Sequence, residues 1–460
     1  MHDLLIIGSG SAGVAAAIEA SGHGAKVAVI ERGTVGGTCV NVGCVPSKTL
    51  LRAAEANHRA NGSSFAGVAP KGSELDFGSI IAQKNGLVED LRQHKYVDVI
   101  DSFGVPLIRG IARFSGPDKL EVHGKEYRAK RFLIATGAAP TLPPIPGLSE
   151  SRPWTYIDAL SPDRQPASLV VIGGGPIGLE LAQAYARLGT RVTILEALPH
   201  ILSGEEEQVS EELRSYLEAE GIEIHTDARV SNVAVDDDYR VTASTRGGER
   251  SFQAERLLVA TGRRPRTEEL GLEQAGVRLN PGGAVEVDRR LATANPAIYA
   301  AGDVAGLPQF VYVGAQAGRL AARNALGVGN DPLDLSGLPR VTFSDPAVAA
   351  VGLTEAEARA AHKDVRVSVL AMDQVPRALA AFDTRGFVKL VTDGEGQILG
   401  VHALAPEAGE LIQEGILAVK FGLNYRDLID TYHPYLTAVE SLRLAAQAFD
   451  TDVKQLSCCA

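Results

Sequence analysis

Residues 3–13, DLLIIGSGSAG, join an apolar run to a glycine-rich turn. The run predicts a buried strand, and the alanine-rich stretch after Gly13 predicts a helix. Between a strand and a helix, such glycines permit a tight turn and bring a pyrophosphate close to the helix N-terminus. The next predicted strand, residues 26–30, leads to Glu31, where an acid accepts a hydrogen bond from a ribose hydroxyl. The segment therefore predicts a βαβ unit that binds a dinucleotide.

A second copy of this pattern follows. Residues 169–178 read LVVIGGGPIG, and the strand predicted over residues 191–195 ends at Glu196. Each copy later returns to a strand that enters Ala-Thr-Gly, at residues 135–137 and 260–262. A single glycine pattern is weak evidence because glycine turns without a ligand are common, whereas two in matching contexts predict two nucleotide-binding domains. The expected nucleotide contacts are Gly8, Gly10, Ser11, Ala12, Gly13, Glu31 and Gly137 in the first copy, and Gly173, Gly175, Gly178, Glu196 and Gly262 in the second.

Composition and charge narrow the class of protein. Asp and Glu number 56 against 45 Lys and Arg, so the net charge of −11 disfavours binding to nucleic acid. No apolar run approaches the roughly 20 residues of a membrane helix, and no export signal precedes the first glycine loop. We therefore expect a cytoplasmic protein without a membrane partner. The four cysteines form two tight pairs, Cys39 with Cys44 and Cys458 with Cys459, which points to redox or metal chemistry.

The most specific segment is residues 36–48, GGTCVNVGCVPSK. Its two thiols are close enough in sequence to close a small loop, and a helix expected to start near Pro46 offers its positive end to a thiolate. The segment resembles the redox-active disulfide motif of the pyridine nucleotide-disulfide oxidoreductases. The resemblance implies that Cys44 is the thiol next to a flavin and Cys39 the outer, exchanging thiol.

The same resemblance implies FAD and NAD(P)H as cofactors and a homodimer whose active sites are shared between chains. It places Lys48 and Glu180 as a pair near the flavin ring, where hydride arrives. It places Asp303 on the ribityl chain of FAD, Thr38 and Lys48 among the flavin contacts, and the backbone at Gly110 and Ala112 near the adenine half.

Alternating strands and helices followed by a strand-rich block predict an α/β part and then an α+β part. The resemblance implies that these are two doubly wound (Rossmann-like) FAD- and NAD(P)-binding domains, an α/β fold, plus a C-terminal α+β dimerisation domain. In that block we expect strands near residues 341–343, 365–370, 387–391 and 398–403, and helices over 409–421 and 437–449. The expected bounds are 1–147 and 266–334 for the two parts of the FAD domain, 148–265 for the NAD(P) domain and 335–460 for the dimerisation domain.

Near the C-terminus the chain departs from the disulfide reductases of this family. Their His-Pro-Thr-x-x-Glu frame, in which the histidine is the acid–base partner of the outer thiol, here runs from Tyr435 to Glu440. Glu440 keeps the place of the acid, Tyr435 replaces the histidine, and His433 is two residues out of register. A phenol with a pKa near 10 is a poor proton shuttle at neutral pH, but its oxygen is a plausible metal contact.

The adjacent cysteines Cys458 and Cys459 favour a dithiol, because neighbouring Cα atoms lie closer than an unstrained disulfide requires. Two soft thiolates are ligands for a soft metal ion. Together with Tyr435 and residues 375–387, VPRALAAFDTRGF, they resemble the mercuric reductase branch of the family. That resemblance implies reduction of Hg(II), delivered as thiol complexes, to Hg(0), with Cys39, Cys44, Cys458, Cys459 and Tyr435 as metal ligands.

Two other functions stay open at this point. In a flavin-dependent disulfide reductase, similar to lipoamide dehydrogenase or thioredoxin reductase, the pair Cys458–Cys459 would relay electrons to a disulfide substrate. A non-catalytic thiol carrier of metal is a different class, and the two nucleotide-binding patterns disfavour it. The acceptor that supports NAD(P)H oxidation, Hg(II) or a disulfide, distinguishes the two enzymes.

Overall fold

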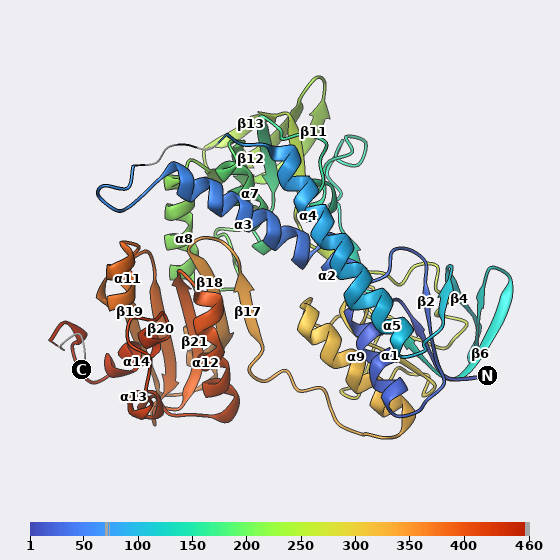
Figure 1. Ribbon diagram of the computed structural model, residues 1–460. Coiled ribbons are helices and arrows are strands. Elements are labelled where there is room, and N and C mark those ends of the chain that lie inside the picture. Colours follow the sequence, from blue (N-terminus) through green and yellow to red (C-terminus); the bar gives the residue numbers. More distant parts are fainter. Residues whose placement is uncertain (70–71, 73, 456–460) are drawn as a thin grey trace.

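The computed structural model describes residues 1–69, 72 and 74–455, so the expected site residues Cys458 and Cys459 lie outside the described residues. Figure 1 shows the domain that holds the N-terminus at one end of the molecule and the orange-to-red C-terminal domain at the other. The long helices α3 (Cys44–Asn61) and α4 (Phe77–Arg92) run along one side between them. None of the helices in the described ranges is long and apolar enough to cross a membrane.

The first domain is a parallel sheet that a distant segment completes. Its strands run in the order β3 (Leu107–Arg109), β2 (Val27–Glu31), β1 (His2–Ile7) and β6 (Lys125–Ile134), and β16 (Ile298–Ala300) pairs with the outer side of β6. β1 and β2 are rich in leucine and β-branched side chains, which are buried on both faces of the sheet. The antiparallel strands β4 (Ala112–Gly116) and β5 (Lys119–Val122) extend β6. The remaining elements are α1 (Ser11–Gly22), α2 (Gly37–Val42), the π-helix η1 (Gln93–Val97), α5 (Asp98–Ser102), the 3₁₀ turn η2 (Asp303–Ala305) and α9 (Val311–Leu326).

The second domain repeats the βαβ unit. Its parallel sheet has the order β10 (Glu223–His225), β9 (Arg191–Leu195), β8 (Ser168–Ile172) and β14 (Arg256–Val259), and α7 (Pro176–Arg187) begins directly after the second glycine loop. Pro176 suits the first turn of α7, where its missing N–H costs nothing. The other elements are α6 (Tyr156–Ala159), α8 (Glu207–Ala219) and the antiparallel strands β11 (Arg229–Val235), β12 (Tyr239–Thr245) and β13 (Gly248–Ala254). A separate two-stranded sheet pairs β7 (Ala138–Pro140) with β15 (Arg263–Pro265).

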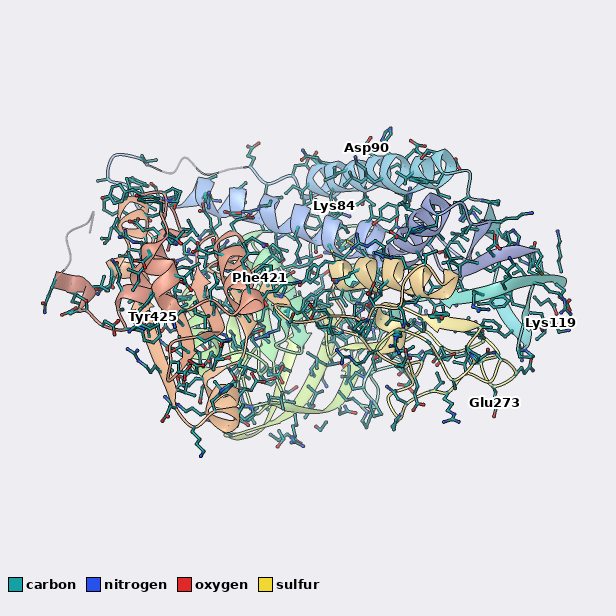
Figure 2. All side chains as sticks on the ribbon, turned by 90° about the horizontal axis from the view of Figure 1, so that it is seen from below. Lys84, Asp90, Lys119, Glu273, Phe421 and Tyr425 are labelled. Atoms are coloured by element: carbon teal, nitrogen blue, oxygen red, sulfur yellow. The ribbon has the colours of Figure 1, made fainter. Side chains whose placement is uncertain are left out.

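The third domain is a five-stranded antiparallel sheet with helices packed on it. Its order is β17 (Pro339–Thr342), β18 (Ala347–Gly352), β21 (Ile398–Ala405), β20 (Phe387–Asp393) and β19 (Val365–Ala371). Its helices are α10 (Glu355–Ala361), α11 (Pro376–Ala381), α12 (Ala408–Phe421), α13 (Tyr425–Asp430) and α14 (Glu440–Gln447), with short 3₁₀ turns η3 (Met372–Gln374) and η4 (Val453–Gln455). Figure 2 shows Tyr425 at this end of the molecule and Lys119 at the opposite end.

The predicted fold class is confirmed, with local differences. The helix that follows the thiol motif begins at Cys44 rather than near Pro46, and the helix expected over 437–449 covers only Glu440–Gln447. Strand β18 and the strands β11–β13 were not predicted. β16, near residue 300, returns to the first sheet, in keeping with a divided first domain, while the domain bounds themselves stay a prediction.

Helices α1 and α9 pack closely beneath the first glycine loop. A Cβ built on Gly318 of α9 would lie 2.0 Å from the carbonyl oxygen of Ala12 on α1, so a side chain there forces backbone apart. A Cβ built on Gly314, one turn earlier, would lie 2.9 Å from the Ser11 hydroxyl oxygen. This close approach sets the position of the loop, because Ser11 and Ala12 form the first turn of α1.

Gly318→Ala should therefore destabilise the protein by about 1–3 kcal/mol, the usual cost of overpacking a tight contact, and should lower flavin retention. The matched control is Gly22→Ala at the end of α1, where a Cβ meets nothing within 4 Å. Denaturant unfolding and flavin content of both variants test this prediction. Equal stability of the two variants would contradict the packing argument.

Candidate active site

The two thiols come together where α2 ends and α3 begins. Cys39 lies half-buried in α2, and Cys44 is the exposed first residue of α3. Both are free thiols, and each shifts the pKa of the other. Gly43 makes the link possible, since a Cβ there would lie 2.9 Å from the Thr38 carbonyl oxygen. The start of α3 at Cys44 places this thiol directly at the positive end of the helix.

The environment separates the two thiols chemically. Hydrogen bonding from Cys39, aided by the positive charge of Lys48, lowers the pKa of Cys44 to about 7 despite partial desolvation of the thiol. The same hydrogen bond and burial raise the pKa of Cys39. Cys44 is therefore the thiolate of the pair near neutral pH, which supports its expected place next to the flavin.

Lys48 and Glu180 meet, as the family resemblance implied. Lys48 Nζ lies 2.7 Å from Glu180 Oε2, joining α3 of the first domain to α7 of the second. The other carboxylate oxygen of Glu180 accepts a hydrogen bond of 2.9 Å from the amide of Phe343 in the third domain. Lys48 Nζ also lies 4.5 Å from the centroid of the Phe343 ring, within cation–π range. Three domains thus converge one helical turn from Cys44.

A cavity of about 430 Å³ extends from the thiols past the first glycine loop. Its walls include nearly all the residues expected to hold FAD, together with both thiols: Gly8, Gly10, Ser11, Ala12, Glu31, Thr38, Cys39, Cys44, Gly110, Ala112, Gly137 and Asp303. Gly13 lies under the loop, where a Cβ would be 1.9 Å from the Gly8 carbonyl oxygen, so it packs helix against strand. Lys48 lines a neighbouring cleft rather than this cavity.

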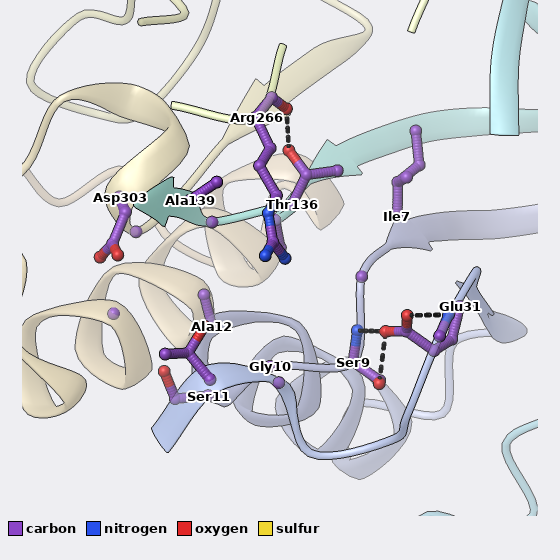
Figure 3. Close-up of a pocket in the computed structure, with 18 of the residues that line it drawn as sticks. Ile7, Ser9, Gly10, Ser11, Ala12, Glu31, Thr136, Ala139, Arg266 and Asp303 are labelled. Carbon is purple, nitrogen blue, oxygen red and sulfur yellow. Dashed lines mark hydrogen bonds between the residues drawn. The ribbon is translucent and has the colours of Figure 1, made fainter. Parts of the chain in front are cut away.

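Polar groups in the cavity fit an extended dinucleotide. Glu31 accepts hydrogen bonds from the amide and hydroxyl of Ser9 and from the amide of Gly33, so its carboxylate is fixed beside the loop (Figure 3). Asp303 pairs with Arg263 at 2.9 Å, and burial raises the pKa of this carboxyl. The buried Nε of Arg263 has no protein partner among the described residues, and the Arg266 side chain extends into the cavity. These groups suit the hydroxyl and phosphate groups of FAD.

The second glycine loop is held by its own acid. Glu196 accepts hydrogen bonds from the amide of Gly174 at 2.6 Å and from the amide of Leu198 at 2.8 Å. A Cβ on Gly178 would lie 2.1 Å from the Gly173 carbonyl oxygen, which again locks helix to strand, and Gly175 has open space before it. Gly262 follows β14 with a φ of 121°. This is the arrangement expected for a nicotinamide dinucleotide.

The C-terminal frame, Tyr435 to Glu440, does not line the cavity onto which the thiols open. Tyr435 is about half exposed, and Glu440 is buried at the start of α14, where it accepts a hydrogen bond of 3.2 Å from the Leu436 amide. His433 Nε2 lies 2.8 Å from Glu414 on α12, which raises the pKa of this histidine. His433 is therefore engaged with α12 of its own chain, and the structure does not bring Tyr435 to this chain's cavity.

The structure adds residues that the sequence did not predict. Burial, and then the charge of Cys39 and Cys44, raise the pKa of the Tyr96 phenol in η1 to about 12. π-Helices are rare and concentrate at functional sites. Residues 93–97, QHKYV, form one here, but nothing in their sequence predicted it. Arg263, Arg266 and Phe343 were missed because each reaches the site from a distant part of the chain.

Comparisons with known proteins agree with this geometry. The pyridine nucleotide-disulphide oxidoreductase family matches residues 2–318, and its dimerisation domain matches residues 338–446. The chain belongs to this family, and its third domain is the family's dimerisation domain.

Its relatives include several proteins named mercuric reductase. The chain is 47% identical to the mercuric reductase of Bacillus cereus, over 100% of this chain and 73% of that protein, and 45% identical to that of Streptomyces lividans, over 100% and 98%. Among solved structures it is similar to the HOCl-induced flavoprotein disulfide reductase RclA of Escherichia coli, with a TM-score of 0.86, 32% identity and coverage of 96% of this chain and 98% of that one.

The pKa of Cys44 gives a testable pH dependence. A thiol whose pKa is lowered to about 7 is a thiolate above that pH and loses reactivity as the pH falls through it. Alkylation of reduced protein by iodoacetamide, followed site by site by mass spectrometry, should show Cys44 reacting with a midpoint near pH 7 and Cys39 reacting only at higher pH. Cys39→Ala should move the Cys44 midpoint upward, since it removes the largest cause of the shift. A midpoint that stays put would contradict this assignment.

Coenzyme choice follows from Glu196. A fixed carboxylate at the end of the second strand accepts a bond from a free ribose hydroxyl and repels a 2′-phosphate. NADH should therefore serve at least as well as NADPH. The ratio of kcat/KM for the two coenzymes decides the matter, and a clear preference for NADPH would show that this reading of Glu196 is wrong.

Proposed function

We propose that this chain is a mercuric reductase that reduces Hg(II) to Hg(0) with NAD(P)H. The observation that carries the proposal is the thiol pair Cys39–Cys44, open to the cavity that holds the expected FAD contacts. Full-length similarity to proteins named mercuric reductase supports the choice of Hg(II) as substrate. Mercury(II) is a soft ion, and a thiol with a pKa near 7 supplies the soft ligand it prefers.

The chain binds FAD and NAD(P)H, and the bound flavin supplies the transfer of two electrons from the nicotinamide toward the substrate. The protein's own residues bind, orient and shield. Gly8–Gly13, Glu31 and Asp303 hold the flavin dinucleotide, and the loop Gly173–Gly178 with Glu196 holds the coenzyme. Lys48 and Glu180 pair where the FAD-binding and NAD(P)-binding domains meet.

For the substrate, we assign Cys39 and Cys44 as the inner ligands of Hg(II). Cys39, whose raised pKa keeps it a thiol, gives its proton to the displaced thiolate as its own sulfur binds Hg(II), while Cys44 binds as the thiolate. Two-electron reduction releases neutral Hg(0), which has little affinity for thiolates.

Residues Cys458 and Cys459 are proposed as the pair that takes Hg(II) from thiol complexes before it reaches the inner pair. Half-buried Cys39 leaves little room for a bulky complex, and ligand exchange needs an incoming thiolate. We infer that Tyr435 and Glu440 of the partner subunit complete the site, because the chain belongs to a family with a dimerisation domain and Tyr435 does not reach its own cavity. We place the reaction in the cytoplasm, where NAD(P)H is held.

The second candidate is a disulfide reductase, which the similarity to a flavoprotein disulfide reductase favours. Against it stands Tyr435, since a tyrosine replaces the histidine that serves as acid–base partner of the outer thiol. His433 lies two residues out of register with that frame and is paired with Glu414 of its own chain.

The direct test of the function measures NADH oxidation by purified holoenzyme with either Hg(II) in excess thiol or a disulfide as acceptor. Hg(II) should support turnover, and small disulfides should not. Cys44→Ser should retain FAD, which the glycine loop, Glu31 and Asp303 hold, and lose Hg(II)-dependent turnover. Efficient disulfide turnover without a response to Hg(II) would favour the second candidate.

The role of the terminal pair predicts a dependence on the ligand of mercury. The double variant Cys458→Ala/Cys459→Ala should reduce mercuric halide nearly as well as the parent and Hg(II) bound to a bulky dithiol much more slowly. Initial rates with the two substrates at equal Hg(II) concentration measure this. Equal loss with both substrates would remove the pair from a delivery role.

Sharing of the site between chains predicts complementation. A chain with Cys39→Ala, co-expressed with a chain that lacks both terminal cysteines, should form heterodimers with one complete site. Thiol-bound Hg(II) turnover well above that of either parent homodimer is the expected result. Heterodimers as inactive as their parents would show that each chain uses its own terminal pair.

A further inference from the structure

Three residues on one face of α7 bind the same short segment of the third domain. Glu180, Gln183 and Arg187 recur at helical spacing, and all three side chains are buried. The segment they contact, Phe343–Asp345, connects β17 to β18. The helix that carries Glu180 to the thiols therefore carries, on the same face, two further contacts to another domain.

Each contact is specific. The Phe343 amide donates to Glu180 Oε1 at 2.9 Å. Gln183 holds Asp345 on both sides, accepting from its amide at 2.8 Å and donating to its carbonyl oxygen at 2.8 Å. Arg187 Nη2 lies 2.9 Å from Asp345 Oδ2. A buried glutamine that satisfies both backbone groups of one residue fixes the position of that residue closely.

A second layer comes from residues 375–387, the stretch for which the proposed function gives no role. Arg385 Nη2 lies 2.8 Å from Asp345 Oδ1, and its guanidinium makes a two-point contact with Asp383 at 2.8 and 2.7 Å. Glu220 pairs with Arg187 at 2.8 and 2.6 Å on the other side. Burial raises the pKa of Asp345, and the two guanidinium groups more than offset it. Asp345 therefore remains ionised at the centre of a partly buried network.

We propose that Phe343–Asp345 is a positioning element for the Lys48–Glu180 pair, clamped by Gln183 and by the ion network of Arg187, Asp345 and Arg385. It acts through Phe343, whose amide holds one oxygen of Glu180 so that the other faces Lys48. The ring of Phe343 confines the Lys48 ammonium from a second direction. The third domain thus fixes the orientation of a pair contributed by the first two. This inference rests on the proposed function, in which the pair stands where hydride arrives.

A matched control lies at the same domain contact. Arg340 on β17 makes a two-point ion pair with Glu205 at 2.8 and 2.9 Å, again joining the second domain to the third. This pair is similar in geometry to the clamp but contacts neither Glu180 nor Lys48 in the described structure. Glu205→Gln therefore weakens the domain contact without reaching the positioned pair.

The test uses Gln183→Leu, which keeps the side-chain volume close and removes both contacts to Asp345. Hydrogen–deuterium exchange of the peptide that contains Phe343 should become faster in this variant. Stopped-flow reduction of the bound flavin by NADH should slow by about tenfold. That factor corresponds to the loss of one hydrogen bond to a charged group, here the bond from the Phe343 amide to Glu180. Glu205→Gln should leave flavin reduction within about twofold, since it breaks only an ion pair of ordinary strength.

A double-mutant cycle distinguishes positioning from general damage. If Gln183 acts through Lys48, then adding Gln183→Leu to a Lys48→Met enzyme should slow flavin reduction no further. The same fold-loss in both backgrounds would overturn the proposal, as would unchanged exchange at Phe343. Arg385→Met, at the outer edge of the network, is the milder second variant and should show the same pattern. Exchange is measured without turnover, so a holoenzyme inactive with Hg(II) would overturn the proposed function and leave the test of the clamp intact.

Discussion

The rest of the structure depends on the contact between Lys48 and Glu180. It joins the helix that begins at Cys44 to the helix that begins at the second glycine loop, and it sets the two nucleotide-binding domains against each other. A largely buried carboxylate is costly unless both of its oxygens are satisfied. Lys48 and the Phe343 amide satisfy them from two different domains, so the relative placement of all three domains is constrained at one carboxylate.

The same contact links fold to chemistry. The ammonium of Lys48 contributes to the lowered pKa of Cys44, while the Cys39 thiol contributes most and keeps its own proton. One thiolate and one thiol are what ligand exchange on a soft metal ion needs, because an incoming sulfur must bind and a displaced one must be protonated. Both sulfurs open onto the cavity with the flavin contacts, so electron delivery and metal binding share one space.

Local patterns allowed much of the fold to be predicted. The two βαβ units were predictable because strand, glycine turn and acid lie within about 30 residues of each other. Strand β18, with the sequence AVAAVG, was missed because alanine carries little strand preference and its burial depends on β17 and β21. The exposed edges of β11 and β13 carry no alternation strong enough to predict them. The pairing of Lys48 with Glu180 was predicted from the family resemblance, whereas Phe343, Arg263 and Tyr96 reach the site through tertiary packing alone.

The central claim is that the enzyme transfers the two electrons of NADH to Hg(II), which is released as Hg(0). The most direct measurement is an anaerobic turnover of holoenzyme with a limiting amount of NADH and excess thiol-bound Hg(II), in which volatile mercury is trapped and quantified. The account predicts one Hg(0) released for each NADH oxidised, and none from a Cys44→Ser holoenzyme that still binds FAD. Oxidation of NADH without release of Hg(0), or release that persists without Cys44, would contradict it.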